Sequence, residues 1–345
     1  MSDSGAAGLT IHAGVPKAGS SSIQTWLAEN AERLRSSHDT VVAVAREGAP
    51  ITTGIFDGSG TINSAALVKT MIWGGDDRTP ALNAFLADLG SLCEAHAHVI
   101  VTSEAFESFL WRPDEDFVLG LESFAARHPV RVVYYLRPQH AALEAAWRQW
   151  GFRSKGPPSL FLTLRADRME YASSYARAKD LAPTIELIPR ALREDLLDGG
   201  DVVADFANRY LGLGNESLQR EFVNPSLPLE VVNLLREAPP GTFWDSIHDN
   251  ATLGEIKQLL ANLDLPESDR IRRSRAVLQA YCHERFEPGN LELIQRMGWP
   301  VSDWVPAPEE PVRGHLAELD SLWSPQASNA ERQVLFAAIL RALGR

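Results

Sequence analysis

Short apolar runs alternate with segments of helical periodicity through about the first 190 residues of the chain. Each run has five to seven residues, a length typical of strands buried in a sheet. The runs are 9–13 (LTIHA), 40–45 (TVVAVA), 98–104 (HVIVTSE), 131–137 (RVVYYLR) and 184–188 (TIELI). Apolar residues recur at helical spacing in segments 23–34, 81–96 and 143–150. The alternation predicts an α/β fold, a three-layer core with a central parallel sheet.

The pattern changes after about residue 213, where the strands stop and only helical periodicity continues. The helical segments are 231–238, 253–263, 274–286 and 291–297. A Pro-rich connector at 299–312 follows, and a last helix begins at Ser328, with Glu331 three residues later in a capping-box pattern. We expect the wide apolar face of this helix to pack on the body of the protein in preference to a partner subunit.

The two patterns divide the chain, although they do not require separate domains. We interpret residues 1–345 as a single domain with three portions. These are an α/β core at 8–215, a C-terminal helical portion at 216–300, and the connector with the terminal helix at 301–345.

Composition and charge narrow the kinds of partner. The 345 residues are 45% hydrophobic, and no apolar run reaches the ~18 residues of a membrane span. A net charge of -12 argues against nucleic acid or anionic membrane, so an anionic ligand would need a local positive site. The first ten residues lack the pattern of a signal peptide, and neither Cys93 nor Cys282 has metal-site spacing. We therefore expect a cytoplasmic protein with reduced thiols.

A segment rich in Gly and Ser, 14–22 (GVPKAGSSS), joins the first predicted strand to the first predicted helix. Loop amides and a helix N-terminus converge at such a junction and create an anion site. Gly14 and Gly19 allow the backbone to approach a ligand closely, and Lys17 adds a full positive charge. The three serines after Gly19 supply hydroxyl donors and a helix cap. The segment therefore predicts a site for a phosphate or sulfate group.

The order of residues in this loop differs from that of an ATP-binding P-loop. In the pattern GxxxxGK[ST], the Lys follows the second Gly and a hydroxyl residue follows the Lys. Here Lys17 comes two residues before Gly19, and no Lys follows that Gly. The arrangement that holds a metal and a γ-phosphate is therefore missing. This disfavours a P-loop kinase, although Glu104 at the end of a predicted strand can imitate the acidic metal ligand of such enzymes.

The stretch PKAGSSS resembles the 5′-phosphosulfate loop of bacterial sulfotransferases that use PAPS (3′-phosphoadenosine 5′-phosphosulfate). The family usually has Thr at the position of Ala18. Its 3′-phosphate site uses a strand-end Arg, which corresponds to Arg137, and a Ser eight residues later, where this chain has Ala145. The resemblance covers about residues 9–298, with weaker similarity at 101–106, 195–206, 223–228 and 285–298.

The resemblance implies in-line transfer of a sulfuryl group from PAPS to a hydroxyl or amine of a carbohydrate or small-molecule acceptor, with PAP released and no metal required. Lys17 and the loop amides would stabilise charge on the leaving phosphate, and Glu104 would act as general base. His12, at the end of the first predicted strand, is a second candidate for the base. The residues expected to bind the donor are Pro16, Lys17, Ala18, Gly19, Ser20, Ser21, Ser22, Arg137 and Ala145.

A noncatalytic protein of the same fold, which binds a nucleotide or a glycan, is the main alternative. Ala18 and Ala145 favour it, whereas the presence of Lys17 and Glu104 favours catalysis. The basic cluster 271–275 (IRRSR) could reach the 3′-phosphate or an acidic acceptor, but a solvated helix face explains it more simply. The acceptor stays open among carbohydrates, lipid head groups, peptides and small natural products, because acceptor specificity depends on loops.

Overall fold

The structure is a computed structural model of the chain. It describes residues 8–15, 18–44, 52–53, 71, 75–107, 115–154, 156–213, 227–236, 268–301, 304–308, 314–323 and 337. The helix expected at 253–263, nearly all of the terminal helix, and the loop residues Pro16 and Lys17 lie outside the described residues.

The chain forms two compact units. Unit 1 consists of Met1–Arg137, Tyr171–Glu221 and Met297–Pro300. Unit 2 consists of Pro138–Glu170, Phe222–Arg296 and Val301–Arg345. The sequence places residues 138–170 in the α/β core, whereas the structure groups them with the later helical residues.

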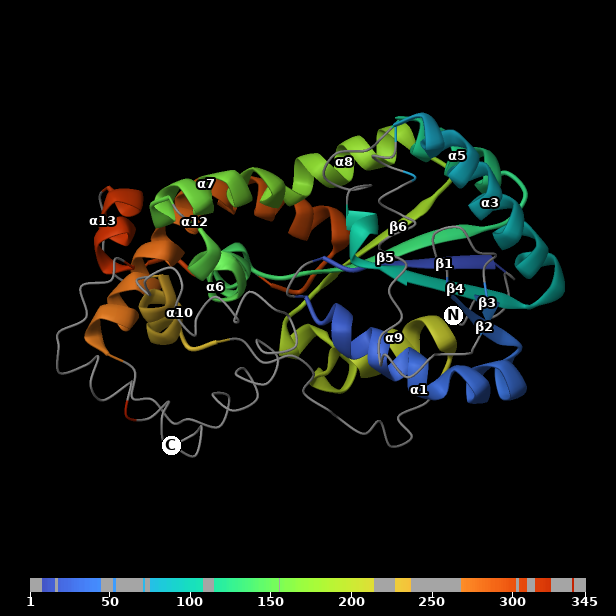
Figure 1. The fold of residues 1–345 in the computed structure, drawn as a ribbon, viewed down its shortest axis with the longest axis horizontal. Coiled ribbons are helices and arrows are strands. Elements are labelled where there is room, and N and C mark those ends of the chain that lie inside the picture. The colour runs from blue at the N-terminus through green and yellow to red at the C-terminus, as the bar shows by residue number, and fades with distance from the viewer. Residues whose placement is uncertain are drawn as a thin grey trace. The chain divides into compact units, whose positions relative to one another are not determined.

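Unit 1 contains an α/β arrangement around a sheet of five parallel strands, which confirms the expected fold class at this level (Figure 1). The described sheet has the order β3-β2-β4-β1-β5-β6, and the short β3 is antiparallel to β2. The strands are β1 (Gly8–Ala13), β2 (Thr40–Val44), β3 (Thr52–Thr53), β4 (His98–Ser103), β5 (Val130–Leu136) and β6 (Glu186–Ala191).

Four of the five predicted strands lie within one residue of their observed bounds, but β6 begins two residues later and ends three residues later than expected. The prediction stopped at residue 188 because Pro189 reads as a strand terminator. Its missing N–H is tolerated because β6 is the last strand of the described sheet. The two-residue β3 is too short to leave a sequence pattern.

Helices cover both faces of this sheet (Figure 1). One face packs against α1 (Ser20–His38) and α9 (Val202–Leu211), and the other lies under α3 (Arg78–Ala95), α5 (Glu115–Ala125) and α8 (Tyr171–Leu181). Short 3-10 helices connect the elements of unit 1: η1 (Gly75–Asp77), η2 (Glu104–Phe106), η5 (Glu194–Leu196) and η6 (Asp198–Gly200). The inner strands are buried on both faces, so their sequences are apolar runs without alternation.

The connections of β1 and β4 leave the sheet toward opposite faces. β1 leads into α1, which covers one face, whereas β4 leads through η2 toward α5 on the other face. The two strands are neighbours in the sheet, so their carboxyl ends border a topological switch point. Ligands of open α/β sheets bind in the crevice at such a point.

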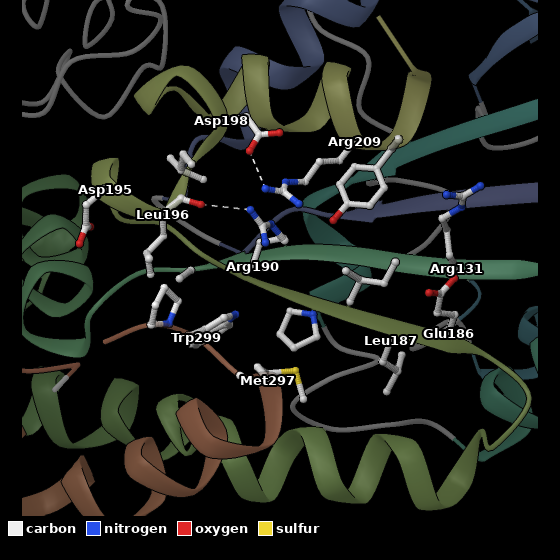
Figure 2. A pocket seen from close by; sticks show the side chains of 17 residues that line it. Arg131, Glu186, Leu187, Arg190, Asp195, Leu196, Asp198, Arg209, Met297 and Trp299 are labelled. Atoms are coloured by element: carbon white, nitrogen blue, oxygen red, sulfur yellow. Dashed lines mark hydrogen bonds and ion pairs between the residues drawn. The ribbon is translucent and has the colours of Figure 1, made fainter. Parts of the chain in front are cut away.

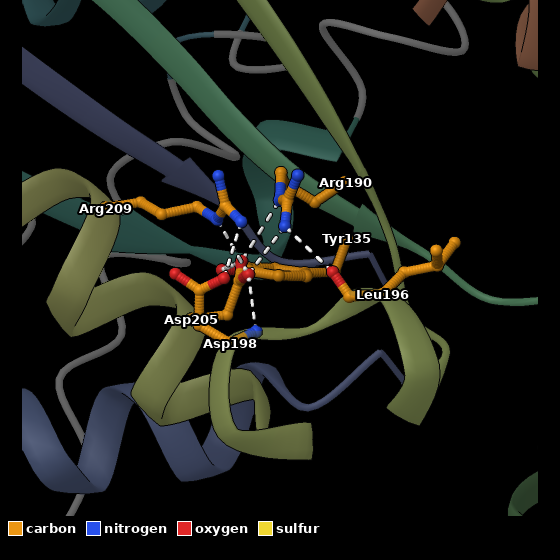
Figure 3. Close-up of polar contacts among 6 residues, drawn as sticks. All are labelled: Tyr135, Arg190, Leu196, Asp198, Asp205 and Arg209. Carbon is orange, nitrogen blue, oxygen red and sulfur yellow. Dashed lines mark hydrogen bonds and ion pairs between the residues drawn. The ribbon is translucent and has the colours of Figure 1, made fainter. Parts of the chain in front are cut away.

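The Asp205 carboxylate is the centre of a buried polar network in unit 1 (Figure 3). Although its side chain is fully buried, it accepts hydrogen bonds from Tyr135 Oη (2.9 Å), Arg190 Nε (3.0 Å), Arg209 Nε (2.9 Å) and the Asp198 amide (3.1 Å). Burial alone raises the pKa of the Asp205 carboxyl, but the hydrogen bond and charge of Arg190 outweigh it and hold this pKa below its usual value. The network joins β5, β6 and α9.

Unit 2 is helical in its described part. Its elements are α6 (Gln139–Trp150), η3 (Gly151–Arg153), α7 (Pro158–Ala166), η4 (Asp167–Met169), α10 (Leu229–Arg236), α12 (Asp269–Met297, without its last residue) and α13 (His315–Leu322). The two helices expected at 274–286 and 291–297 are one continuous helix, with Pro288 inside it. The buried side chains of Gln139 and Asn290 exchange two hydrogen bonds near this proline, at 2.7 and 3.2 Å, and tie the helix to α6.

Stacked aromatic rings form the centre of unit 2. Trp147 and Trp323 are fully buried, with ring centroids 5.2 Å apart and nearly parallel planes. The Arg236 guanidinium lies 4.7 Å from the centroid of Trp147 and donates to the carbonyls of Gly156 and Trp323. Residues 138–170 therefore share a core with α10 and α13, which explains why they belong to unit 2.

We expect Asp205→Asn to lower the free energy of unfolding by about 3–5 kcal/mol, because Arg190 loses its buried counter-charge. Asp195→Asn is the matched control, since Asp195 pairs with Arg193 at a solvent-exposed position and its loss should cost less than about 1 kcal/mol. Urea unfolding followed by circular dichroism measures both. Equal effects of the two substitutions would show that the Asp205 network does not stabilise unit 1.

Candidate functional site

The loop between β1 and α1 lies at the switch point described above. The Gly14 amide donates to the carbonyl of Ser103, the last residue of β4, at 3.1 Å. The loop then turns back, because the Ala18 amide and the Ser20 hydroxyl both donate to the carbonyl of Val15, at 3.1 and 3.2 Å. Ala18 and Ser20 are buried by this turn. The described part of the loop therefore makes a tight bend over the ends of β1 and β4.

Gly14 is the point at which the loop, α1 and the end of β4 meet. A Cβ atom on Gly14 would lie 2.8 Å from the Ser20 hydroxyl oxygen and 3.1 Å from Cγ of Glu104. A side chain at this position would therefore clash with Ser20 and press against Glu104. The structure thus brings together Gly14, Ser20 and Glu104, three residues that the sequence places in one site.

Gly19 begins α1 in a conformation that favours glycine. Its φ is 81°, and a Cβ there would lie 2.8 Å from Cγ1 of Val202, the first residue of α9. The amides of Ser22 and Ile23 donate to the carbonyl of Gly19, which starts the helix. Ser21 and Ser22 are partly exposed in this first turn, where a helix N-terminus favours negative charge.

Glu104 is the first residue of η2, directly after β4. Its side chain is partly exposed, in contrast to the buried strand residues before it. The carboxylate therefore stands at the carboxyl edge of the sheet beside the loop, in a place suited to accept a proton from a bound molecule.

His12 lies in the interior of unit 1, beneath the loop. Its side chain is buried, with Nδ1 2.8 Å from Oγ1 of Thr102 and its ring centroid 5.5 Å from that of Phe206. Burial lowers the pKa of His12 to about 3, so the ring is neutral near pH 7. Because it is enclosed in this way, His12 is better placed to support the loop than to take a proton from an acceptor.

Thr102 and Gln24 are two residues of this region that sequence reasoning missed. Both are buried, and Gln24 Nε2 donates to Oγ1 of Thr102 at 3.4 Å. Thr102 thus links His12 of β1 to Gln24 of α1, directly before Ser103 and Glu104. A polar residue inside the apolar run VIVTS was the signal available in the sequence.

The two positions expected at the 3′-phosphate belong to different units. Arg137 follows β5 at the carboxyl edge of the sheet in unit 1, and its carbonyl accepts a hydrogen bond from Tyr171 Oη at 2.9 Å. Its side chain is partly exposed. Ala145 is buried within α6 of unit 2. Arg137 can therefore offer a charged donor, whereas Ala145 offers only a methyl group.

The basic cluster 271–275 has acidic partners within unit 2. In the basic cluster, Arg275 forms two hydrogen bonds with Glu144, and Arg273 forms two with Glu318. These ion pairs join α12 to α6 and α13 within unit 2. Trp147 lies in the core of unit 2.

The described residues contain no group of three or more His, Cys, Asp or Glu side chains suited to hold a metal ion. Among the helices that the structure describes, none is both long and apolar enough to cross a membrane. Comparisons of the chain with family models, with curated proteins and with solved structures found no match.

We expect Gly19→Ala to destabilise the protein more than Gly212→Ala. Both glycines have positive φ, so both substitutions carry a backbone cost of about 1–2 kcal/mol. Only Gly19 also faces a side chain at 2.8 Å, because nothing lies within 4 Å of a Cβ on Gly212. Thermal unfolding of the two variants measures the difference. Equal losses would mean that Val202 moves aside without cost and that α9 does not constrain the loop.

We expect His12 to make folding stability depend on pH. Its pKa is about 3 in the folded chain and 6.5 as an ordinary histidine, so its contribution is complete above pH 6.5 and is lost as pH falls toward 3. His12→Gln should therefore reduce the slope of unfolding free energy against pH by about 1.4 kcal/mol per unit between these values.

Urea unfolding at pH 5 and pH 6 tests this slope. The matched control is His38→Gln, which replaces an exposed histidine at the end of α1. A slope unchanged by His12→Gln would show that His12 takes up its proton in the folded state.

Proposed function

We propose that this chain is a PAPS-dependent sulfotransferase, which transfers a sulfuryl group to a hydroxyl or amine of a carbohydrate or small-molecule acceptor. The observation that carries the proposal is the meeting of Gly14, Ser20 and Glu104 at the switch point of the sheet. It supports an anion-binding loop with a carboxylate beside it. The order PKAGSSS then favours a sulfotransferase over a kinase, because no Lys follows Gly19.

The described loop residues fit a phosphosulfate group. Gly14 allows the loop to pass close to Ser20 and Glu104, and the first turn of α1 places Ser21 and Ser22 at a helix N-terminus, where a negative charge is favoured. The fit is weaker at the 3′-phosphate, because only one of the two expected positions, Arg137, has a polar side chain and Ala145 provides no hydroxyl. Loss of one neutral hydrogen bond costs about 1 kcal/mol, which weakens donor binding without preventing it.

PAPS supplies the sulfuryl group and an adenosine bisphosphate leaving group. The acceptor oxygen or nitrogen forms a bond to sulfur while the bond from sulfur to the bridging phosphate oxygen breaks. Lys17 and the amides of the loop stabilise the negative charge that develops on that oxygen. Glu104 takes the proton that the acceptor loses, and it stands on the edge of the sheet where an acceptor can approach it.

His12, Thr102 and Gln24 have a positioning role in this scheme. Their hydrogen bonds join β1, β4 and α1 beneath the loop, which fixes the distance between the start of α1 and Glu104. A preorganised arrangement of this kind lowers the cost of reorganisation during the reaction.

Calorimetric titration with PAP and with ADP tests the proposal. We expect PAP to bind at least about tenfold more tightly than ADP, because only PAP has a 3′-phosphate for Arg137. Lys17→Ala should weaken PAP binding by a similar factor. Arg35→Ala is the matched control, since it removes one positive charge at an exposed position near the far end of α1.

The outcome separates the alternatives. If the wild-type protein binds PAP no better than ADP, the sulfotransferase proposal is wrong for this chain. If PAP binds tightly, Glu104→Gln distinguishes catalysis from binding. That variant should keep its affinity for PAP and lose about 100-fold or more in sulfuryl transfer to an acceptor. An unchanged transfer rate would exclude Glu104 as the base.

A further inference from the structure

A cavity of unit 1 lies along β6, at the end of the described sheet (Figure 2). Its volume is about 990 Å³, at the upper end of the range for small-molecule sites. All six residues of β6 line it, together with residues 195–198, Arg131, Arg209, Tyr210 and residues 297–300. None of the residues expected to bind PAPS is among them.

The backbone of β6 offers hydrogen-bond donors toward this cavity. The Leu192 amide donates to the Leu136 carbonyl of β5 at 2.7 Å. Backbone groups of a strand alternate in direction, so the amides of Leu187 and Ala191 point away from β5. In the described structure, neither amide has an acceptor. Pro189 has the same orientation but lacks an N–H, so a partner strand would lose a bond there, which favours a small molecule.

Two guanidinium groups are held rigidly at the wall of the cavity (Figures 2 and 3). Arg190 donates to Asp205 through Nε and Nη2 and to the Leu196 carbonyl through Nη2. Arg209 donates to Asp205 through Nε and to Asp198 through Nη2. Among the described contacts, the Nη1 group of each arginine has no acceptor. Asp205 therefore orients both side chains and leaves one donor group on each for a ligand.

The balance of donors and acceptors favours an anion as the ligand. Asp205, Asp198 and Asp195 already bind Arg190, Arg209 and Arg193. Arg131, which also lines the cavity, forms no hydrogen bond or ion pair with any described residue. Its register partner on β6 is Glu186, an exposed carboxylate at one end of the cavity, so the ligand must avoid that end.

The remaining wall is suited to the organic part of a ligand. Met297, Trp299 and Pro300 line the cavity with apolar and aromatic surface, and Tyr210 adds a ring with a hydroxyl. Burial raises the pKa of Tyr210, so the hydroxyl keeps its proton and can donate. Small-molecule sites combine an apolar wall with a few fixed polar groups in the same way.

We propose that this cavity binds a small organic oxyanion, a carboxylate or a phosphate monoester, with Arg190 and Arg209 holding its oxygen atoms and Trp299 packing against its organic part. The proposal does not depend on sulfotransferase activity, because the cavity and the β1–α1 loop share no residue.

Calorimetric titration with phenylacetate, phenyl phosphate and neutral benzyl alcohol tests this proposal. At least one of the two anions should bind saturably, whereas benzyl alcohol should not, and the preferred anion identifies the carboxylate or phosphate class. Arg209→Gln should weaken binding of that anion by about tenfold. Arg35→Gln, the matched control on α1, should change it by less than about twofold.

Two further variants keep the test decisive. Arg131→Gln removes no described ion pair, so it tests the cavity even if Arg209→Gln unfolds the protein, and it should weaken binding by about threefold or more. Lys17→Ala should leave anion binding in this cavity unchanged, which separates the cavity from the proposed PAPS site. Absence of saturable binding by both anions, or equal affinities of the Arg131 and Arg35 variants, would overturn the proposal.

Discussion

The buried Asp205 carboxylate is the interaction on which the arrangement of unit 1 depends. It pairs with Arg190 of β6 and Arg209 of α9, and it accepts a hydrogen bond from the Tyr135 hydroxyl on β5. A buried charge of this kind is tolerated only when its hydrogen bonds are satisfied, so the three elements must assemble together. Once α9 is placed by this network, Val202 meets Gly19 and Phe206 meets His12. The position of the β1–α1 loop therefore depends on the Asp205 carboxylate, which is not a residue of the loop.

Close approach of backbone segments is the second constraint. The loop crosses the end of β4 at Gly14, where Ser20 and Glu104 occupy the space on both sides of the glycine. It then enters α1 through Gly19, whose positive φ redirects the chain. Each glycine thus allows a backbone path that a side chain would hinder. The same path leaves amides and hydroxyls near the edge of the sheet, where an anion can reach them.

Much of unit 1 could be predicted from the sequence, because strands buried on both faces are apolar runs that stand out between helices. The prediction failed for β6 because Pro189 reads as a terminator, and the edge position that tolerates it is a property of the whole sheet. Pro288 misled the prediction in the same way, since α12 continues through it. The proximity of Gly14, Ser20 and Glu104 could be expected from the sequence, because the carboxyl ends of parallel strands meet at one edge of a sheet, and their roles stay predictions.

Long-range features left no such signal. Nothing near Asp205 in the sequence indicates that its partners are Tyr135 and Arg190, which are 70 and 15 residues away. Likewise, His12 looks accessible at the end of an apolar run, and only its packing against Phe206 shows that it is enclosed. Partners of this kind are set by tertiary packing, which a single sequence does not display.

Pro189 has a consequence for the protein before it is fully folded. A strand at the end of a sheet is a template for pairing with other chains, and such pairing is the first step of aggregation. The backbone nitrogens of Leu187, Pro189 and Ala191 in β6 face away from the sheet, and the central one, that of Pro189, carries no hydrogen. An incoming chain would therefore meet a gap in the middle of the row. The residue that shifted the predicted end of the strand thus disfavours pairing with another chain at this edge of the sheet.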